Sequence, residues 1–108
     1  MSEESFIVQY DIPAAEIQEA TKEQLDKFVS LIAAGNNEIT NVSIKDFHPG
    51  AGISIMVTVL DYSTCSAIHE VDEFAGIMAR VAGIKFDDST VTISGHPVDP
   101  MEELEPQH

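Results

Sequence analysis

Ile53-Ser54-Ile55-Met56-Val57-Thr58-Val59-Leu60 is the stretch of sequence that decides the fold. Apolar β-branched residues fill every odd position, and a period of two is typical of a strand that buries one face. Residues 6–12 show the same period before Pro13 ends the run. One side of that second stretch carries Phe6, Val8, Tyr10 and Ile12. The two stretches predict two strands that cover one apolar core.

Residues 21–34 predict the first helix, because their apolar side chains recur at the helical spacing. Thr21 and Gln24 are spaced as a capping box, and Gly35 is placed as a stop signal. The apolar stripe also continues toward the N-terminus. The helix could therefore begin as early as Ala14.

Residues 64–82 predict the second helix, with Ser63 or Thr64 as its cap and Gly83 at its end. Its apolar positions again keep the helical spacing. They are Ile68, Val71, Phe74, Ala75, Met78, Val81 and Ala82.

Two shorter strands complete the pattern. Residues 41–45 alternate in polarity, and the turn-rich segment 48–52 joins them to residues 53–60 as a hairpin. Residues 90–94 alternate in the same way and predict the last strand. Residues 84–89 could add a short extended piece.

The order strand, helix, strand, strand, helix, strand predicts a single-domain α+β fold of the ferredoxin-like βαββαβ type. We expect a four-stranded antiparallel sheet in the order 4-1-3-2, with two helices on one face. A chain of 108 residues is long enough for one domain, which we place at residues 1–96. Residues 97–108 predict an acidic flexible tail, because prolines interrupt them and they carry acidic but no basic residues.

The sheet face turned away from the helices is predicted to carry a small apolar spot with a polar rim. Alternation places Ile7, Met56 and Leu60 on that face, among polar side chains. A rimmed patch of this kind suits dimerisation or the docking of a partner. The alternative is an ordinary half-solvated sheet with scattered apolar residues.

Nineteen acidic and five basic residues give a net charge of −14, which excludes several classes of function. Direct DNA or RNA binding needs positive charge to neutralise phosphates. An anionic membrane surface is repelled too, and a run of about 18 apolar residues that could span a bilayer is absent from the sequence. Residues 1–5 do not resemble a secretory signal, and the single cysteine, Cys65, suits a reducing compartment. We therefore expect a cytoplasmic protein.

Cys65 and His69 form the one pair in the sequence that suggests nucleophilic catalysis. They lie about one helical turn apart near the start of the second predicted helix, where a thiolate would be stabilised. Nearby acidic residues oppose that charge, and an oxyanion hole is not indicated. We therefore expect no catalytic residues and no enzyme activity.

Metal and cofactor motifs are equally incomplete. His69 and Glu73 are four residues apart, but a third ligand would have to come from elsewhere in the fold. Residues 87–88 and 99–105 are acidic without the ligand pattern of a calcium loop. The sequence predicts neither a metal site nor a cofactor.

Seven acidic residues lie opposite the apolar stripes of the predicted helices. If both helices cover one sheet face, their carboxylates project from one side of the molecule and attract a basic cleft. The alternative is that the charge serves solubility or high salt. The seven are Glu16, Glu19, Glu23, Asp26, Glu70, Asp72 and Glu73.

These patterns favour a small acidic protein that binds and inhibits or regulates a basic protein, with nucleic-acid-handling proteins as the favoured class. The carboxylates would act as a nucleic-acid mimic, occupying positions that phosphates normally hold. Virus-encoded inhibitors of host-defence enzymes and immunity proteins against nuclease toxins have a similar size and charge. The alternative is a self-associating structural or assembly module, a homodimer joined through the open sheet face.

Overall fold

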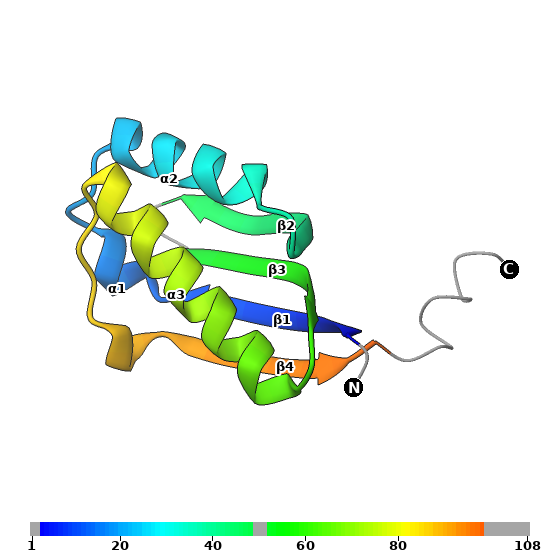
Figure 1. Ribbon diagram of the computed structural model, residues 1–108. Helices are drawn as coiled ribbons and strands as arrows, with labels where there is room; N and C mark the ends of the chain where they lie inside the picture. The colour runs from blue at the N-terminus through cyan, green and yellow to red at the C-terminus, as the bar shows by residue number, and fades with distance from the viewer. Residues whose placement is uncertain (1–2, 49–51, 99–108) are drawn as a thin grey trace, which may run out of the picture.

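The computed structural model describes residues 3–48 and 52–98, which fold into a four-stranded antiparallel sheet and three α-helices (Figure 1). The predicted α+β class is confirmed. The strands are β1 (Glu4–Ile12), β2 (Ile39–His48), β3 (Gly52–Asp61) and β4 (Thr92–Pro97). The helices are α1 (Ala14–Ile17), α2 (Lys22–Ala34) and α3 (Thr64–Ala82), with a 3-10 turn, η1 (Asp88–Thr90), before β4.

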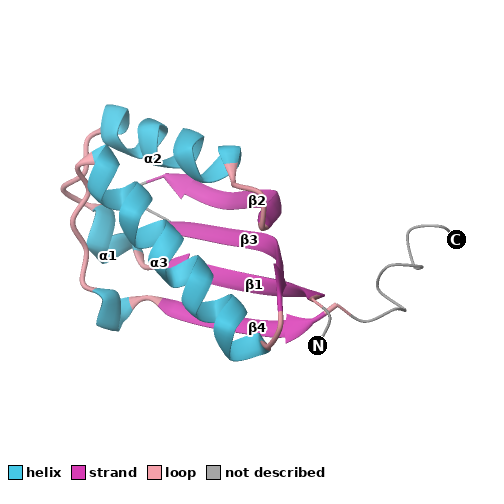
Figure 2. Cartoon of the chain, viewed as in Figure 1, coloured by secondary structure: helices cyan, strands magenta, loops and turns pink. Residues whose placement is uncertain are grey.

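The strands stand in the order β2-β3-β1-β4, which reads β4-β1-β3-β2 from the opposite edge. Each neighbouring pair is antiparallel. The central pair aligns Val8 with Val57 and Tyr10 with Ile55, so the apolar sides of both strands coincide. The helices all lie against one face of this sheet, and the other face is open (Figure 2).

The helical layer contains three helices, where the sequence predicted two. Thr21 takes an extended backbone conformation as the N-cap of α2, and this separates α2 from the short helix α1. The capping box is confirmed: Thr21 Oγ1 accepts from Gln24 N at 3.1 Å, and Gln24 Oε1 accepts from Thr21 N at 2.9 Å. The predicted caps of α3 are also confirmed, with Ser63 at its start and Gly83 at its end.

The core lies between the sheet and the helices. Every inward position predicted for residues 6–12 and 53–60 is buried, and Tyr10 is fully enclosed. The α2 stripe contributes Leu25, Phe28 and Ile32, while α3 contributes mainly small residues and Val71. Small side chains on α3 allow that helix to pack close to the central strands.

Strand β2 is longer than predicted, and it contains a bulge. Thr40 pairs with Thr58 and Ser43 pairs with Met56. Two residues of β2 therefore lie opposite one residue of β3. Asn41 has φ +50°, a left-handed conformation that asparagine adopts more readily than most residues. The bulge turns both Ile39 and Ile44 toward the core although they are five positions apart.

Residues between α3 and β4 form no strand, so the extended piece suggested at 84–89 is wrong. Asp87 instead organises a turn, because its carboxylate accepts from Ser89 N and Ser89 Oγ. β4 then runs from Thr92 to Pro97, and Val98 N donates to Ser5 O at 3.0 Å. The remainder of the predicted tail lies outside the described residues.

Candidate functional site

The seven predicted acidic residues divide between the two ends of the helical layer. α2 and α3 run in opposite directions over the sheet, so the start of α2 lies beside the end of α3 (Figure 1). One group sits on α1, on α2 and on the short link between them, and the other sits in the first half of α3. The sequence predicted that these carboxylates would form one continuous acidic surface. In the structure they form two separate groups.

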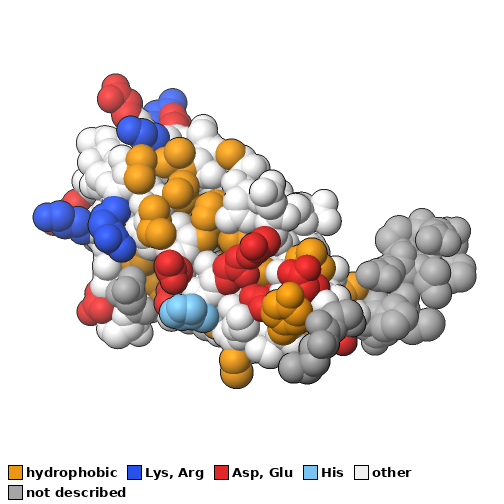
Figure 3. Space-filling view, viewed as in Figure 1, with side chains coloured by type: hydrophobic (Ala, Val, Ile, Leu, Met, Phe, Trp, Pro, Cys, Tyr) orange, Lys and Arg blue, Asp and Glu red, His pale blue; other side chains and the backbone are white. Residues whose placement is uncertain are grey.

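The α1–α2 group has mixed surroundings. The Glu16 carboxylate accepts a hydrogen bond from Asp87 N at 2.7 Å. On α2, Glu23 and Asp26 are flanked by the exposed Lys22 and Lys27, which offset their charge. Figure 3 shows basic side chains along this end of the helical face, with acidic ones among them. This end is therefore a poor mimic of a phosphate backbone.

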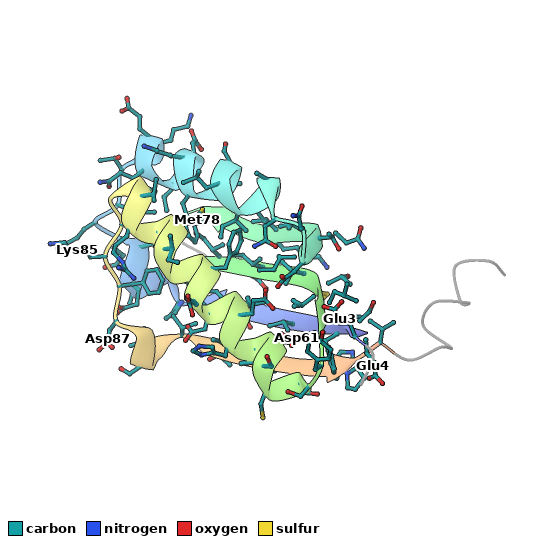
Figure 4. All side chains as sticks on the ribbon, viewed as in Figure 1. Glu3, Glu4, Asp61, Met78, Lys85 and Asp87 are labelled. Carbon is teal, nitrogen blue, oxygen red and sulfur yellow. The ribbon has the colours of Figure 1, made fainter. Side chains whose placement is uncertain are left out.

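The opposite end of the molecule carries a cluster of acidic residues. Asp61, the last residue of β3, pairs directly with Glu4 of β1, and it lies beside the first half of α3 (Figure 4). Lys85 and Asp87 lie at the far end of the same view. We call the following set the acidic end: Glu4, Glu38, Asp61, Glu70 and Glu73.

Asp61 is the one buried charged residue in the described part of the chain, with 8% of its surface exposed. Its carboxylate accepts from Tyr62 N at 2.7 Å and has Ser66 as a further hydrogen-bond partner. Burial alone would raise its pKa, but hydrogen bonds from Tyr62, Ser66 and Glu70 outweigh burial and lower the pKa below its usual value. Asp61 therefore remains ionised.

Glu70 is held in the opposite protonation state. Partial burial, followed by the hydrogen bonds and negative charges of Glu38 and Asp61, raises its pKa to about 8. At neutral pH the Glu70 carboxyl keeps its proton and donates it to these neighbours. One proton thus connects the α2–β2 loop, the end of β3 and α3.

The α2–β2 loop that carries Glu38 has a defined conformation. Asn36 Oδ1 accepts from both Glu38 N and Ile39 N at 2.8 Å. Glu38 O accepts from Leu60 N at 3.0 Å, which attaches the loop to β3. Gly35 permits the reversal after α2 because its φ is +59°.

A groove opens above this cluster, and we call it the α3 groove. Four carboxyl side chains line it, together with exposed apolar side chains: Tyr62 is 57% exposed and Ile77 is 41% exposed. Apolar side chains border acidic ones in this part of the surface in Figure 3. The lining residues are Asn36, Glu38, Asp61, Tyr62, Ser66, His69, Glu70, Glu73, Phe74 and Ile77.

The sequence indicated part of this groove and missed the rest. Glu70 and Glu73 were expected on a partner-binding face, and both line it. Glu38, Asp61 and Tyr62 were not identified, because they lie in or beside loops where periodicity gives no direction. The signal available in the sequence was that acidic residues lie near the ends of predicted strands and helices. The register of the β2–β3 hairpin brings these acidic residues together.

The open sheet face places the other predicted contact residues next to one another. Ile7 is opposite Thr58 in β3, and Met56 and Leu60 flank Thr58 along that strand. Diagonal neighbours in a sheet are within reach of long side chains. Met56 is 39% exposed and Leu60 is 40% exposed, whereas Ile7 is half-buried. The apolar spot is therefore contiguous but small.

The remaining sequence candidates lie along the first half of α3. Cys65 is exposed near the start of α3, and His69 Nε2 lies 3.4 Å from Glu73 Oε2, one turn along the helix. Across residues 3–48 and 52–98, no three His, Cys, Asp or Glu side chains are grouped so as to hold a metal ion. The helices in this part of the chain are too short or too polar to cross a bilayer.

Comparison with known proteins adds no relative to this description. Searches of family models, of curated proteins and of solved structures found no match to the chain.

Proposed function

We propose that this protein is a non-catalytic binding protein that attaches to a basic protein through the α3 groove and the acidic end. The groove is the observation that carries the proposal. Its lining includes four carboxyl side chains and one histidine but neither lysine nor arginine. Exposed apolar walls next to concentrated charge are typical of contact surfaces.

The two kinds of side chain have different tasks in this proposal. Carboxylates at the acidic end attract a positively charged partner over about one Debye length and orient its approach. Tyr62 and Ile77 then lose their exposed surface in the complex and set its lifetime. The partner would be inhibited or regulated because the basic surface it uses is covered.

Nucleic-acid-handling proteins remain the partner class we favour, because they display extended basic surfaces. The geometry supports a narrower form of that idea than a nucleic-acid mimic. The acidic end is one compact patch, and the α1–α2 group is interspersed with lysines. We infer that the protein covers a local basic site and does not imitate a long phosphate backbone.

We infer a ferredoxin-like arrangement, which is supported by the β-α-β-β-α-β order of the main elements and by helices on one sheet face. Helix α1 is then an addition between β1 and α2. A shared fold of this type would not itself indicate a function.

The experiment is affinity capture from native lysate with elution by a salt gradient. We compare the full chain with Glu70→Lys plus Glu73→Lys in the groove, and with Glu23→Lys plus Asp26→Lys on α2 as a control that changes the net charge at least as much. The proposal expects a basic protein that the first variant loses and the control keeps. Equal retention by both variants, or equal loss, would contradict it.

A second candidate is self-association through the open sheet face, favoured by the contiguous spot of Ile7, Met56 and Leu60. It predicts a dimer that persists at high salt, because burial of apolar surface is not screened. Sedimentation of the full chain and of Met56→Glu plus Leu60→Glu tests this. A monomer at all concentrations in the wild-type chain would eliminate the candidate.

A further inference from the structure

The shape and charge of the α3 groove also restrict which side chain of a partner can enter it. Carboxyl groups converge there from three elements: Glu38 from the α2–β2 loop, Asp61 from β3 and Glu70 from α3. Tyr62 borders them with more than half of its surface exposed. The groove therefore presents several hydrogen-bond acceptors beside the exposed aromatic ring of Tyr62.

We propose that the α3 groove receives an arginine side chain of the protein partner, with its guanidinium between the carboxylates and its plane against Tyr62. This inference rests on the proposed function and names the chemistry of the partner. The negative charge of the groove calls for a positively charged ligand. The apolar walls favour a cationic side chain of a polypeptide over a free ion.

Arginine fits this arrangement better than lysine does. A guanidinium offers five N–H donors in a planar fork, so it can bond to carboxylates that come from different directions. It also stacks on aromatic rings, whereas the ammonium of lysine is a strongly hydrated point charge. Ile77 and Phe74 can contact the partner residues next to the arginine, since both line the same groove.

Binding would be linked to release of a proton. Glu70 carries its proton because it is partly buried and faces Glu38 and Asp61. Tyr62, His69 and Glu73 are the other titratable groups around the groove. A guanidinium supplies the positive charge that this proton now provides, so the Glu70 carboxyl loses the proton to solvent when arginine binds. Affinity should therefore increase with pH up to about 8, where Glu70 ionises without the ligand.

The test uses the full chain and three short acetylated peptide amides, Ala-Arg-Leu-Ala and its lysine and norleucine counterparts. Binding and the ionisation of Glu70 are followed by NMR of backbone amides and side-chain carboxyl carbons. We expect the arginine peptide to bind about fivefold or more tightly than the norleucine peptide, with lysine between them. We also expect it to lower the pKa of Glu70 by about one unit, a shift that corresponds to a tenfold affinity change across the titration.

Two variants of equal formal charge change separate the groove from the overall charge. Glu70→Gln keeps the neutral shape of the protonated residue but has no proton to release, so it should lose the pH dependence and weaken arginine binding at pH 8.5 about fivefold. Glu23→Gln on α2 should change neither. The wild-type comparison of three peptides does not depend on either variant folding.

The results distinguish this inference from the proposed function. Equal binding of the arginine and norleucine peptides, an unmoved Glu70 carboxyl, or chemical-shift changes confined to other surfaces would each overturn the arginine assignment. If lysate capture still finds a basic partner in those cases, the proposed function survives. If the arginine peptide binds the groove but capture fails, the proposed function is the part that is wrong.

Discussion

Replacing Glu70 with glutamine should make the protein more stable at alkaline pH and leave it nearly unchanged at acidic pH. In the folded chain partial burial, together with the neighbouring Glu38 and Asp61, raises the pKa of Glu70 from 4.5 to about 8. The folded state thus binds this proton more tightly than the unfolded state. The free energy of unfolding must fall as the pH rises from about 4.5 through 8, because over this range the folded chain still holds a proton that the unfolded chain has lost.

The size of the effect follows from the environment of Glu70. One unit of pKa shift corresponds to about 1.4 kcal/mol of differential stability. Water reaches part of the Glu70 side chain and screens its neighbours, so we expect about 1–2 kcal/mol between pH 5 and pH 9 and not the full value of the shift. In a domain of this size that is a change in Tm of about 5–15 °C.

Urea unfolding followed by circular dichroism at pH 5, 7 and 9, at constant ionic strength, measures this difference. Glu70→Gln should exceed the wild-type chain by about 1–2 kcal/mol at pH 9 and agree with it within about 0.5 kcal/mol at pH 5. Glu23→Gln removes the same formal charge from an exposed site on α2 and should track the wild-type chain throughout. A wild-type stability that is flat from pH 5 to pH 9 would refute the shared proton.

Four further predictions concern the scaffold, each measured as the free energy of unfolding in urea. Gly35→Ala should destabilise the chain by about 1–3 kcal/mol, because φ is +59° and the new Cβ would lie 2.4 Å from Ile39 O. Gly76→Ala should instead stabilise by about 0.5–1 kcal/mol, because open space surrounds that α3 position; a loss of stability there would contradict the described packing. Thr21→Ala removes the capping box and should cost about 1 kcal/mol, and no measurable loss would mean that the cap is redundant. Phe28→Ala empties the core and should cost about 3–5 kcal/mol; a cost below about 1 kcal/mol would be inconsistent with its burial.

The sequence predicted those parts of the fold that follow from local periodicity. Residues 53–60 and 6–12 alternate without interruption, so their buried sides could be read directly, and the caps of α2 and α3 have specific chemistry. The bulge at Asn41 breaks the period of two, which is why β2 was predicted too short. The start of α2 at its Thr21 cap was predicted, but α1 was not identified as a separate helix because one apolar stripe runs through both.

The groove could not be predicted in the same way, because its carboxylates come from three elements that are far apart in the sequence. Glu38 follows a helix, Asp61 ends a strand and Glu70 lies within a helix, and each looks like an ordinary surface residue alone. Their convergence depends on the hairpin register and on the path of α3. Burial of Asp61 to 8% exposure is likewise a tertiary effect, since its neighbours in sequence are exposed.

The charge of the molecule is distributed asymmetrically, which its net charge alone does not indicate. Carboxylates cluster where β3 ends, while Arg80 and Lys85 follow toward the opposite end of α3. A basic partner would therefore meet the groove end first, and rising salt should slow association more than it speeds dissociation, because the apolar walls are not screened. Protonation acts differently: lowering the pH restores the Glu70 proton inside the groove and competes with the partner for the same carboxylates. We therefore expect salt to weaken the complex by slowing association, and acid to weaken it by speeding dissociation. Simple surface attraction would not produce both effects.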